Sequence, residues 1–340
     1  MTEKKVRIAQ VGIANHGRTI VNATRDAGNL QLVSCFDINM TANERVAKEF
    51  GATAAEGYDQ LVNDPNVDAV SLVTPNHLHL EQIRKAVQAK KHIFVDKPIT
   101  NTVAEAREAI GLAKKGSLIL MVGHNTRRRQ VFRRAKALLA EQRIGEIVAV
   151  EANLSRPAGL QAGLPAWKAD RRTCALLPMM QLGIHFVDIV EYLIGPIERV
   201  SCFAGNIAMP NQVFDSTAAI LQLKSGIPVS LTSYYVSADA YFVRIYGTKG
   251  TIHCFPLKLR LDLLQDGEPK ETIEEDFSSE GPGSYILQMR EFGDCVLRGV
   301  QPETGGNQGL RALAVIEAMV KSVENRSVVE LSDILKEEHP

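Results

Sequence analysis

The most constraining feature of the sequence is an alternation of short apolar runs with longer amphipathic stretches, which begins at Val6 and ends near Gly123. The apolar runs cover residues 6–12, 31–37, 69–74, 92–95 and 118–122, and stretches with helical spacing separate them at 18–26, 41–49, 78–89 and 103–115. Strands that are apolar throughout are typical of a parallel sheet covered by helices on both faces. The pattern therefore predicts a doubly wound α/β domain over residues 1–123.

The rest of the chain has a different pattern of apolar and polar residues. Runs typical of strands lie at 146–155, 200–206, 216–224, 228–236, 242–246 and 251–255, with no helix between most of them, and helical patterns lie at 127–142, 182–193, 284–297 and 308–324. Ser225-Gly226 and Asp266-Gly267 are hairpin turn signals. We predict an α+β domain over residues 124–340 with a large open, mainly antiparallel sheet. Such a sheet has an uncovered face and edges, so we expect a homodimer or homotetramer formed through it.

The composition excludes several classes of protein. Lys+Arg and Asp+Glu both number 39, which disfavours nucleic acid as a partner because phosphate binding needs excess positive charge. No apolar run is long enough to span a bilayer, and residues 1–5 lead directly into a strand without a signal peptide. The five cysteines are far apart and include no Cys-x-x-Cys. We therefore expect no membrane partner, no metal site and a cytoplasmic location.

A glycine-containing loop follows the first strand and leads into the first helix: Gly12-Ile13-Ala14-Asn15-His16-Gly17. In a Rossmann loop, the glycines allow a tight turn, close approach of the backbone to a pyrophosphate, and close packing of helix on strand. The helix N-terminus then offers N–H groups to the anion. Ala14 stands where the second glycine is usual. We predict that Gly12, Ile13, Ala14, Asn15 and Gly17 bind a dinucleotide, the alternative being an ordinary strand-to-helix turn.

Asp37 closes the second apolar run. An acid at this position accepts hydrogen bonds from the adenosine ribose hydroxyls. Its negative charge would also repel a 2′-phosphate, so Asp37 predicts NAD in preference to NADP. The alternative interpretation is a helix cap or a solvated strand end.

Two segments carry a resemblance to a known family: Val73-Thr74-Pro75-Asn76-His77-Leu78-His79 and Phe94-Val95-Asp96-Lys97-Pro98. They resemble the Thr-Pro-Asn and Glu-Lys-Pro motifs of the glucose–fructose oxidoreductase/inositol dehydrogenase (Gfo/Idh/MocA) family of NAD(P)-dependent sugar and cyclitol oxidoreductases. Val122-Gly123-His124-Asn125, Trp167-Lys168 and Gly183-Ile184-His185-Phe186-Val187-Asp188 resemble later landmarks. The resemblance covers nearly the whole chain.

The resemblance implies roles for particular residues. Those expected at the cofactor are Thr74, Pro75, Asn76, His79, Asp96 and Lys97, and those expected at the substrate are Asn125, Trp167, Gln181 and Asp188. The catalytic residues are expected to be Lys97 and His185. The sequence departs from the family in having Asp96 for glutamate, Gln181 where many members have aspartate, and Leu176-Leu177 where a glycine pair is usual.

The chemistry explains the choice of His185 and Lys97. Oxidation of a carbinol leaves a proton that a side chain with a pKa near neutrality accepts best, and imidazole is such a group. We predict that His185 is the principal acid/base, that Lys97 anchors the alcohol or carbonyl, and that Gln181 positions the substrate. The alternatives are a core histidine and a surface-loop lysine. Thr74 and His79 would then be helix caps, and Trp167 is either a core residue or a stacking lid.

The predicted function is an NAD-dependent oxidoreductase that transfers a hydride between the nicotinamide and a secondary hydroxyl or ketone of a sugar, cyclitol or glycoside. Two alternatives share the fold. One is a glycosidase or lyase that recycles its NAD within each turnover, and the other is a non-catalytic NAD-binding regulator. Fold alone does not decide between them.

Overall fold

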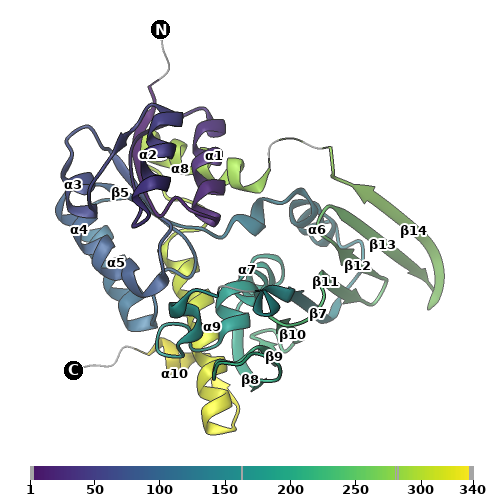
Figure 1. Ribbon diagram of the computed structural model, residues 1–340. Helices are drawn as coiled ribbons and strands as arrows, with labels where there is room; N and C mark the ends of the chain where they lie inside the picture. The colour runs from purple at the N-terminus through teal and green to yellow at the C-terminus, as the bar shows by residue number, and fades with distance from the viewer. Residues whose placement is uncertain (1–3, 162–163, 280, 282, 337–340) are drawn as a thin grey trace. The chain divides into compact units, whose positions relative to one another are not determined.

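The computed structural model describes residues 4–161, 164–279, 281 and 283–336. The chain divides into two compact units (Figure 1). The first unit comprises Met1–Asn125 and Pro282–Arg311, and the second comprises Thr126–Gly281 and Ala312–Pro340. The sequence analysis placed everything after residue 123 in the second domain. In the structure the first unit extends to Asn125 and also includes Pro282–Arg311.

The first unit is built on a parallel sheet of six strands in the order β3-β2-β1-β4-β5-β6. These strands are β1 (Val6–Val11), β2 (Leu30–Phe36), β3 (Thr53–Ala54), β4 (Ala69–Leu72), β5 (His92–Val95) and β6 (Leu120–Val122). The predicted doubly wound fold is confirmed. The strand order reverses between β1 and β4, and ligands of open parallel sheets bind at the carboxyl ends of strands at such a switch point.

Helices cover this sheet at the predicted places. They are α1 (His16–Ala27), α2 (Met40–Phe50), α4 (His79–Gln88) and α5 (Val103–Lys115). The short β3 and the helix α3 (Tyr58–Asn63) were not predicted. They are too short to show a hydrophobic period, which needs a window of roughly 11–18 residues.

The helix α8 (Ser284–Arg298) belongs to the first unit although it lies far along the chain, and Figure 1 shows it beside α1. Met289 and Phe292 of α8 are buried in one hydrophobic cluster with Ile8 and Ile20. Phe292 also meets Phe94 edge to face, with ring centroids 5.9 Å apart. The apolar side of α8 therefore completes the core on one face of the parallel sheet.

The second unit contains a sheet of nine strands in the order β14-β13-β12-β11-β7-β10-β9-β8-β15. The strands are β7 (Ile147–Ser155), β8 (Ile197–Gly205), β9 (Ser216–Leu223), β10 (Pro228–Tyr234), β11 (Ala240–Gly247), β12 (Gly250–Cys254), β13 (Lys258–Gln265), β14 (Glu268–Asp276) and β15 (Val329–Glu330). Neighbouring strands are antiparallel except β7 and β10. The prediction of a large, mainly antiparallel sheet is confirmed.

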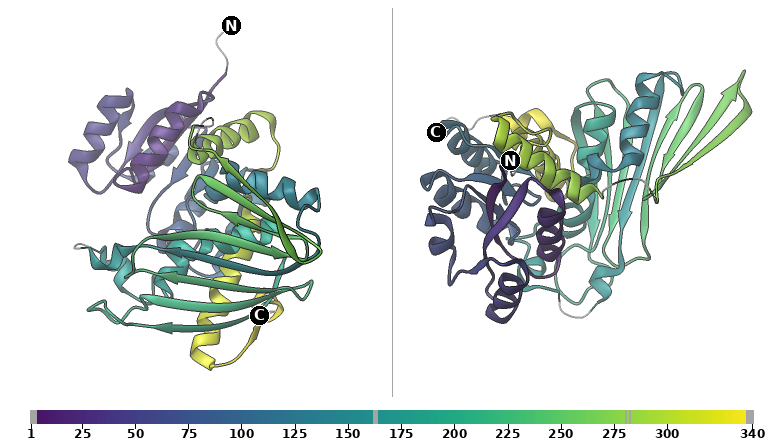
Figure 2. Two further views of the ribbon diagram at one scale, coloured as in Figure 1. Left: turned by 90° about the vertical axis from the view of Figure 1, so that its right-hand side faces the viewer. Right: turned by 90° about the horizontal axis from the view of Figure 1, so that it is seen from above.

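One face of this sheet is covered and the other is open. The helices of the unit are α6 (Gln130–Ala140), α7 (Ile184–Leu193), the greater part of α9 (Gly306–Asn325) and α10 (Leu331–Leu335). Figure 2 shows the opposite face as bare strands with no helix in front of them. Side chains alternate accordingly, so that Leu221 of β9 is fully buried whereas Ile220 is 58% exposed and Phe203 of β8 is 78% exposed.

No helix among the described residues is long and apolar enough to cross a membrane. All five cysteines are buried and free. Within the described part of the chain, no three or more His, Cys, Asp or Glu side chains are grouped so that they could hold a metal ion.

Candidate functional site

The loop after β1 has the geometry that its glycines imply. Gly12 has φ +79°, and a Cβ there would stand 2.1 Å from the carbonyl oxygen of Val73. A Cβ on Gly17 would stand 2.2 Å from the carbonyl oxygen of Gly12. Both positions therefore require glycine. Ala14 and Asn15 are exposed at the start of α1, where a helix has unbonded N–H groups.

Asp37 stands at the end of β2 against this loop. One carboxylate oxygen accepts hydrogen bonds from the N–H groups of Ile13 (2.8 Å) and Ala14 (3.3 Å), and the other accepts one from Asn39 (2.9 Å). The acid thus holds the loop, which the sequence did not predict. The oxygen that accepts from Asn39 has a second lone pair for a ribose hydroxyl. An exposed helix start beside a strand-end carboxylate fits an adenine dinucleotide.

Two residues predicted to lie at the cofactor are buried and hold the neighbouring loops. Asn76, in the 3₁₀ helix η1 (Asn76–Leu78), is 2% exposed and donates from its amide to Asn101 (2.6 Å). His79 is 1% exposed. Their side chains are occupied inside the first unit, and their place at the cofactor stays a prediction.

His79 connects two loops that follow adjacent strands. Its Nε2 lies 3.0 Å from the carbonyl oxygen of Thr74, and its Nδ1 lies 3.0 Å from that of Pro98 and 3.2 Å from that of Ile99. Burial lowers the pKa of His79, with a partial opposing effect from Asp96. Neither His79 nor Thr74 caps α4, since no side chain caps that helix and the Thr74 hydroxyl donates to Gln82 (2.7 Å). Pro75, half-buried, is the residue that precedes η1.

The loop after β5 carries Asp96 and Lys97, both half-buried, and the Lys97–Pro98 peptide bond is cis. A carboxylate oxygen of Asp96 lies 3.6 Å from Nε2 of His16, at the start of α1. The His16 ring meets Tyr285 of α8 edge to face, with centroids 5.5 Å apart. The sequence analysis missed both partners. His16 lay within the quoted loop without being assigned a role, and Tyr285 is distant in sequence.

Asn125, predicted to contact the substrate, is 2% exposed, and its amide donates to the hydroxyl of Ser284 (2.8 Å). Both residues belong to the first unit. In this structure Asn125 therefore fastens the end of the first chain segment to the segment that contains α8.

In the second unit, the π-helix η5 (Met179–Gly183) leads directly into α7. Such single π turns are often found at functional sites. Gln181 on η5 and His185 on α7 are half-buried. Nδ1 of His185 lies 3.3 Å from the Thr126 hydroxyl, and the amide nitrogen of Gln181 lies 3.8 Å from the Cys174 sulfur.

Asp188 lies one turn after His185 and was predicted to contact the substrate. Both of its oxygens instead accept from the Arg127 guanidinium, at 2.7 Å each, and its side chain is 1% exposed. A contact of Asp188 with the substrate stays a prediction. Thr126 and Arg127 are neighbours, so two adjacent residues hold α7 at His185 and Asp188.

Trp167 lies in the 3₁₀ helix η4 (Ala166–Ala169) and is half-buried. Its carbonyl oxygen accepts from the Thr173 hydroxyl (2.5 Å), and the Lys168 ammonium lies 5.3 Å from the centre of its ring. The side chain is therefore not a residue of the hydrophobic core. Its role as a stacking lid stays a prediction.

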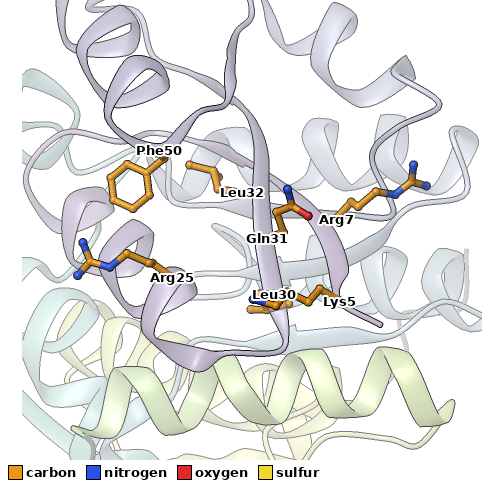
Figure 3. A pocket seen from close by; sticks show the side chains of 7 residues that line it. All are labelled: Lys5, Arg7, Arg25, Leu30, Gln31, Leu32 and Phe50. Carbon is orange, nitrogen blue, oxygen red and sulfur yellow. The ribbon is translucent and has the colours of Figure 1, made fainter. Parts of the chain in front are cut away.

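A cavity of about 620 Å³ lies elsewhere in the first unit, beside the start of β1 and β2 (Figure 3). It is lined by Lys5, Arg7, Arg25, Leu30, Gln31, Leu32 and Phe50. Arg7 is paired with Asp68 and Arg25 with Asp26, so two of its three cations are neutralised. Dinucleotides bind at the carboxyl ends of the strands, so this cavity is distinct from the loop at Gly12 and Asp37.

Comparison with known proteins decides the family. Residues 6–124 match the NAD-binding Rossmann-fold model of the Gfo/Idh/MocA oxidoreductase family, and residues 136–331 match its C-terminal alpha/beta domain model. The chain belongs to this oxidoreductase family. The resemblance seen in the motifs is thereby confirmed.

Individual relatives are distant but match from end to end. The inositol 2-dehydrogenase of Rhizobium meliloti is 25% identical over 96% of this chain and 99% of its own length. The 2,7-anhydro-N-acetylneuraminate hydratase of Escherichia coli is 26% identical over 96% of this chain and 97% of its own. A levoglucosan dehydrogenase solved with NADH and levoglucosan has the same fold, with a TM-score of 0.88, 19% identity, and coverage of 96% of this chain and 100% of its own.

Proposed function

We propose that the protein is an NAD-dependent oxidoreductase that interconverts a secondary hydroxyl and a ketone on a sugar, cyclitol or glycoside. The observation that carries the proposal is the contact of the Asp37 carboxylate with the glycine loop at the start of α1. When bound there, the nicotinamide cofactor accepts or donates the hydride. The names of the inositol and levoglucosan dehydrogenases support a carbohydrate-like substrate.

The residues of the chain supply proton transfer and positioning. His185 exchanges the proton of the reacting hydroxyl, because imidazole changes charge near neutral pH. Lys97 anchors the alcohol or carbonyl by donating a hydrogen bond, which stabilises negative charge on the substrate oxygen. Gln181 positions the substrate through hydrogen bonds, and Asp96 positions Lys97.

The first experiment is a screen of NAD and NADP reduction over sugars, cyclitols and sugar acids. We expect turnover with NAD on at least one compound, and a more than tenfold loss of activity in both His185→Ala and Lys97→Ala. If both variants keep more than a tenth of the activity, the assigned roles are wrong.

Asp37 is proposed to select NAD because its charge repels a 2′-phosphate. Asp37→Asn keeps an oxygen that accepts from Ile13 and Ala14 but removes the charge. We expect the ratio of kcat/KM for NADP to that for NAD to rise by about tenfold, which corresponds to about 1.4 kcal/mol. A wild-type protein that prefers NADP would contradict this role.

A second candidate is a reaction in which NAD is reduced and reoxidised within one turnover. The relative named as a hydratase of an anhydro sugar acid favours it. Absorbance of NADH separates the two candidates, since a dehydrogenase accumulates NADH in proportion to product and a recycling enzyme releases product without it. Binding of NAD without turnover of any compound would instead indicate a regulator.

We also propose that the protein forms a homodimer or homotetramer through the open face of the nine-stranded sheet, and that it functions in the cytoplasm. Five free, buried cysteines support a reducing compartment. The exposed Phe203 and Ile220 support an interface, because large apolar side chains on an uncovered sheet favour association.

A further inference from the structure

The segment 156–181 of the second unit is strongly basic. It contains Arg156, Lys168, Arg171 and Arg172 but only one acid, Asp170, in a chain whose formal net charge is zero. The same segment carries Trp167 and Gln181, two of the residues predicted to contact the substrate. The charge excess is therefore local to the part of the chain that we expect to recognise the substrate.

The acids in and next to this segment are already neutralised. The Arg172 guanidinium contacts both oxygens of Asp170 at 2.6–3.1 Å and lowers the pKa of that carboxyl to about 2. Asp188 is occupied by Arg127. No carboxylate lies between these two acids in the sequence, and Gln181 is neutral.

Two of the arginines keep their charge available. Arg156 and Arg171 are exposed, and neither forms an ion pair with a residue in the described part of the chain. The Arg171 guanidinium lies 4.2 Å from the centre of the Phe214 ring. Stacking of this kind orders the flexible arginine stem and leaves the edge of the guanidinium for a ligand.

Backbone hydrogen bonds hold the chain on either side of these arginines, and one of them leads to Gln181. The N–H of Cys174 donates to the carbonyl oxygen of Asp170 (2.8 Å), and Gln181 contacts the sulfur of Cys174. The N–H of Arg156 donates to the carbonyl oxygen of Tyr234 (3.0 Å).

The neighbouring Tyr235 interacts electrostatically with both Arg156 and Cys174. Burial raises the pKa of Tyr235 to about 12, with smaller opposite electrostatic effects from Cys174 and Arg156. Arg156, Tyr235, Cys174 and Gln181 therefore form one neighbourhood.

A neutral sugar gives a guanidinium no charged partner. A carboxylate matches its paired N–H donors and forms charge-assisted hydrogen bonds. We propose that the substrate is an anionic carbohydrate, specifically one bearing a carboxylate, such as a uronic acid, and that Arg156 and Arg171 bind this group. This inference rests on the proposed function and narrows its substrate class.

The test uses binding as well as turnover, because Trp167 is the only tryptophan in the chain. The purified protein with saturating NAD is titrated with glucuronate, galacturonate, glucose, galactose and glucose 6-phosphate while tryptophan fluorescence is recorded. We expect at least one uronate to bind tenfold or more tightly than its neutral counterpart, with an apparent Kd that rises with ionic strength.

Variants identify the residues. Arg156→Gln and Arg171→Gln are each expected to weaken uronate binding by tenfold or more and to change neutral-sugar binding by less than twofold. The control is the double variant Asp170→Asn/Arg172→Gln, which removes a neutral pair from the same segment and is expected to bind uronate as the wild type does.

The outcomes separate this inference from the proposed function. Turnover of neutral sugars with no preference for uronates overturns the inference and leaves the proposed function in place. Uronate binding that depends on Arg156 and Arg171, without NAD reduction on any compound, supports the inference and contradicts the dehydrogenase. If glucose 6-phosphate binds more tightly than either uronate, the arginines recognise a phosphate group, and the proposed carboxylate substrate is wrong.

Discussion

Thr126 holds the proposed acid/base, although no motif pointed to it. Its hydroxyl lies 3.3 Å from Nδ1 of His185, and the residue is 4% exposed. A hydroxyl both donates and accepts, so it satisfies either tautomer of the ring. The contact fixes the ring so that Nε2 points away from Thr126.

Thr126→Val should therefore lower kcat by about fivefold, because one hydrogen bond contributes about 1 kcal/mol. KM for NAD should stay within twofold of the wild-type value, since Thr126 belongs to the other unit from the glycine loop. Steady-state kinetics measure both constants. Thr126→Ser is the matched control and should retain kcat; an inactive serine variant would show that the hydrogen bond is not the cause.

His79 should make stability depend on pH. Burial lowers its pKa in the folded protein, whereas the unfolded chain has the ordinary value of about 6.5. Below that pH the unfolded state binds a proton that the folded state does not. The free energy of unfolding should therefore fall as the pH drops below about 6.5, by at most about 1.4 kcal/mol per pH unit from this residue.

The measurement is urea unfolding of the wild type and of His79→Gln between pH 5 and 7.5. The variant should be less stable at pH 7.5, by about 1–3 kcal/mol, and should show a shallower pH dependence. His92 and His253 also have pKa values lowered by burial, so part of the slope should remain. Equal slopes in the two proteins would contradict the assignment.

The turn from β1 into α1 requires glycine at position 12 for two reasons, the positive φ and the lack of space for a Cβ. Comparison with a second glycine separates the two effects. Gly12 has φ +79° and no room for a Cβ, whereas Gly28, at the end of α1, has φ +89° with nothing within 4 Å. Alanine at Gly28 suffers only the backbone strain, which costs about 1–2 kcal/mol. Alanine at Gly12 also collides with the carbonyl group of Val73.

Gly12→Ala should therefore destabilise the protein by about 1–3 kcal/mol more than Gly28→Ala. It should also weaken NAD binding, because the N–H groups of Ile13 and Ala14 move with the turn. Urea unfolding and NAD titration by calorimetry give the two values. Similar results for the two variants would show that backbone conformation alone makes glycine necessary.

At the scale of the whole molecule, the open face of the nine-stranded sheet determines the proposed assembly. Phe203→Asp and Ile220→Asp each place a charge on that face, and Val300→Asp places one at an exposed apolar position in the first unit, where the side chain is 49% exposed. Sedimentation should show a dimer or tetramer for the wild type and for Val300→Asp, and a smaller species for the two sheet variants. A monomeric wild type would contradict the proposal.

Local sequence patterns were sufficient to predict the layers of the fold and the glycine loop after the first strand. Short apolar runs such as 6–12 and 92–95 are typical of strands buried on both faces, and Gly12, Gly17 and Asp37 lie close enough in the chain to form one local unit. Both features can be recognised in the sequence because they depend on residues close together in the chain and on the spacing of apolar residues.

Only the tertiary structure showed which residues support the site and which are available to it. Asn76, His79, Asn125 and Asp188 share polar chemistry with residues that touch ligands, but their partners come from elements distant in sequence. For the same reason the sequence did not show that α8 packs in the first unit. An amphipathic pattern predicts that one side of a helix is buried, but it does not identify the elements that cover that side. The hydrogen-bond partners and the burial of these side chains depend on packing between segments that are distant in the sequence, so a local sequence pattern does not predict them.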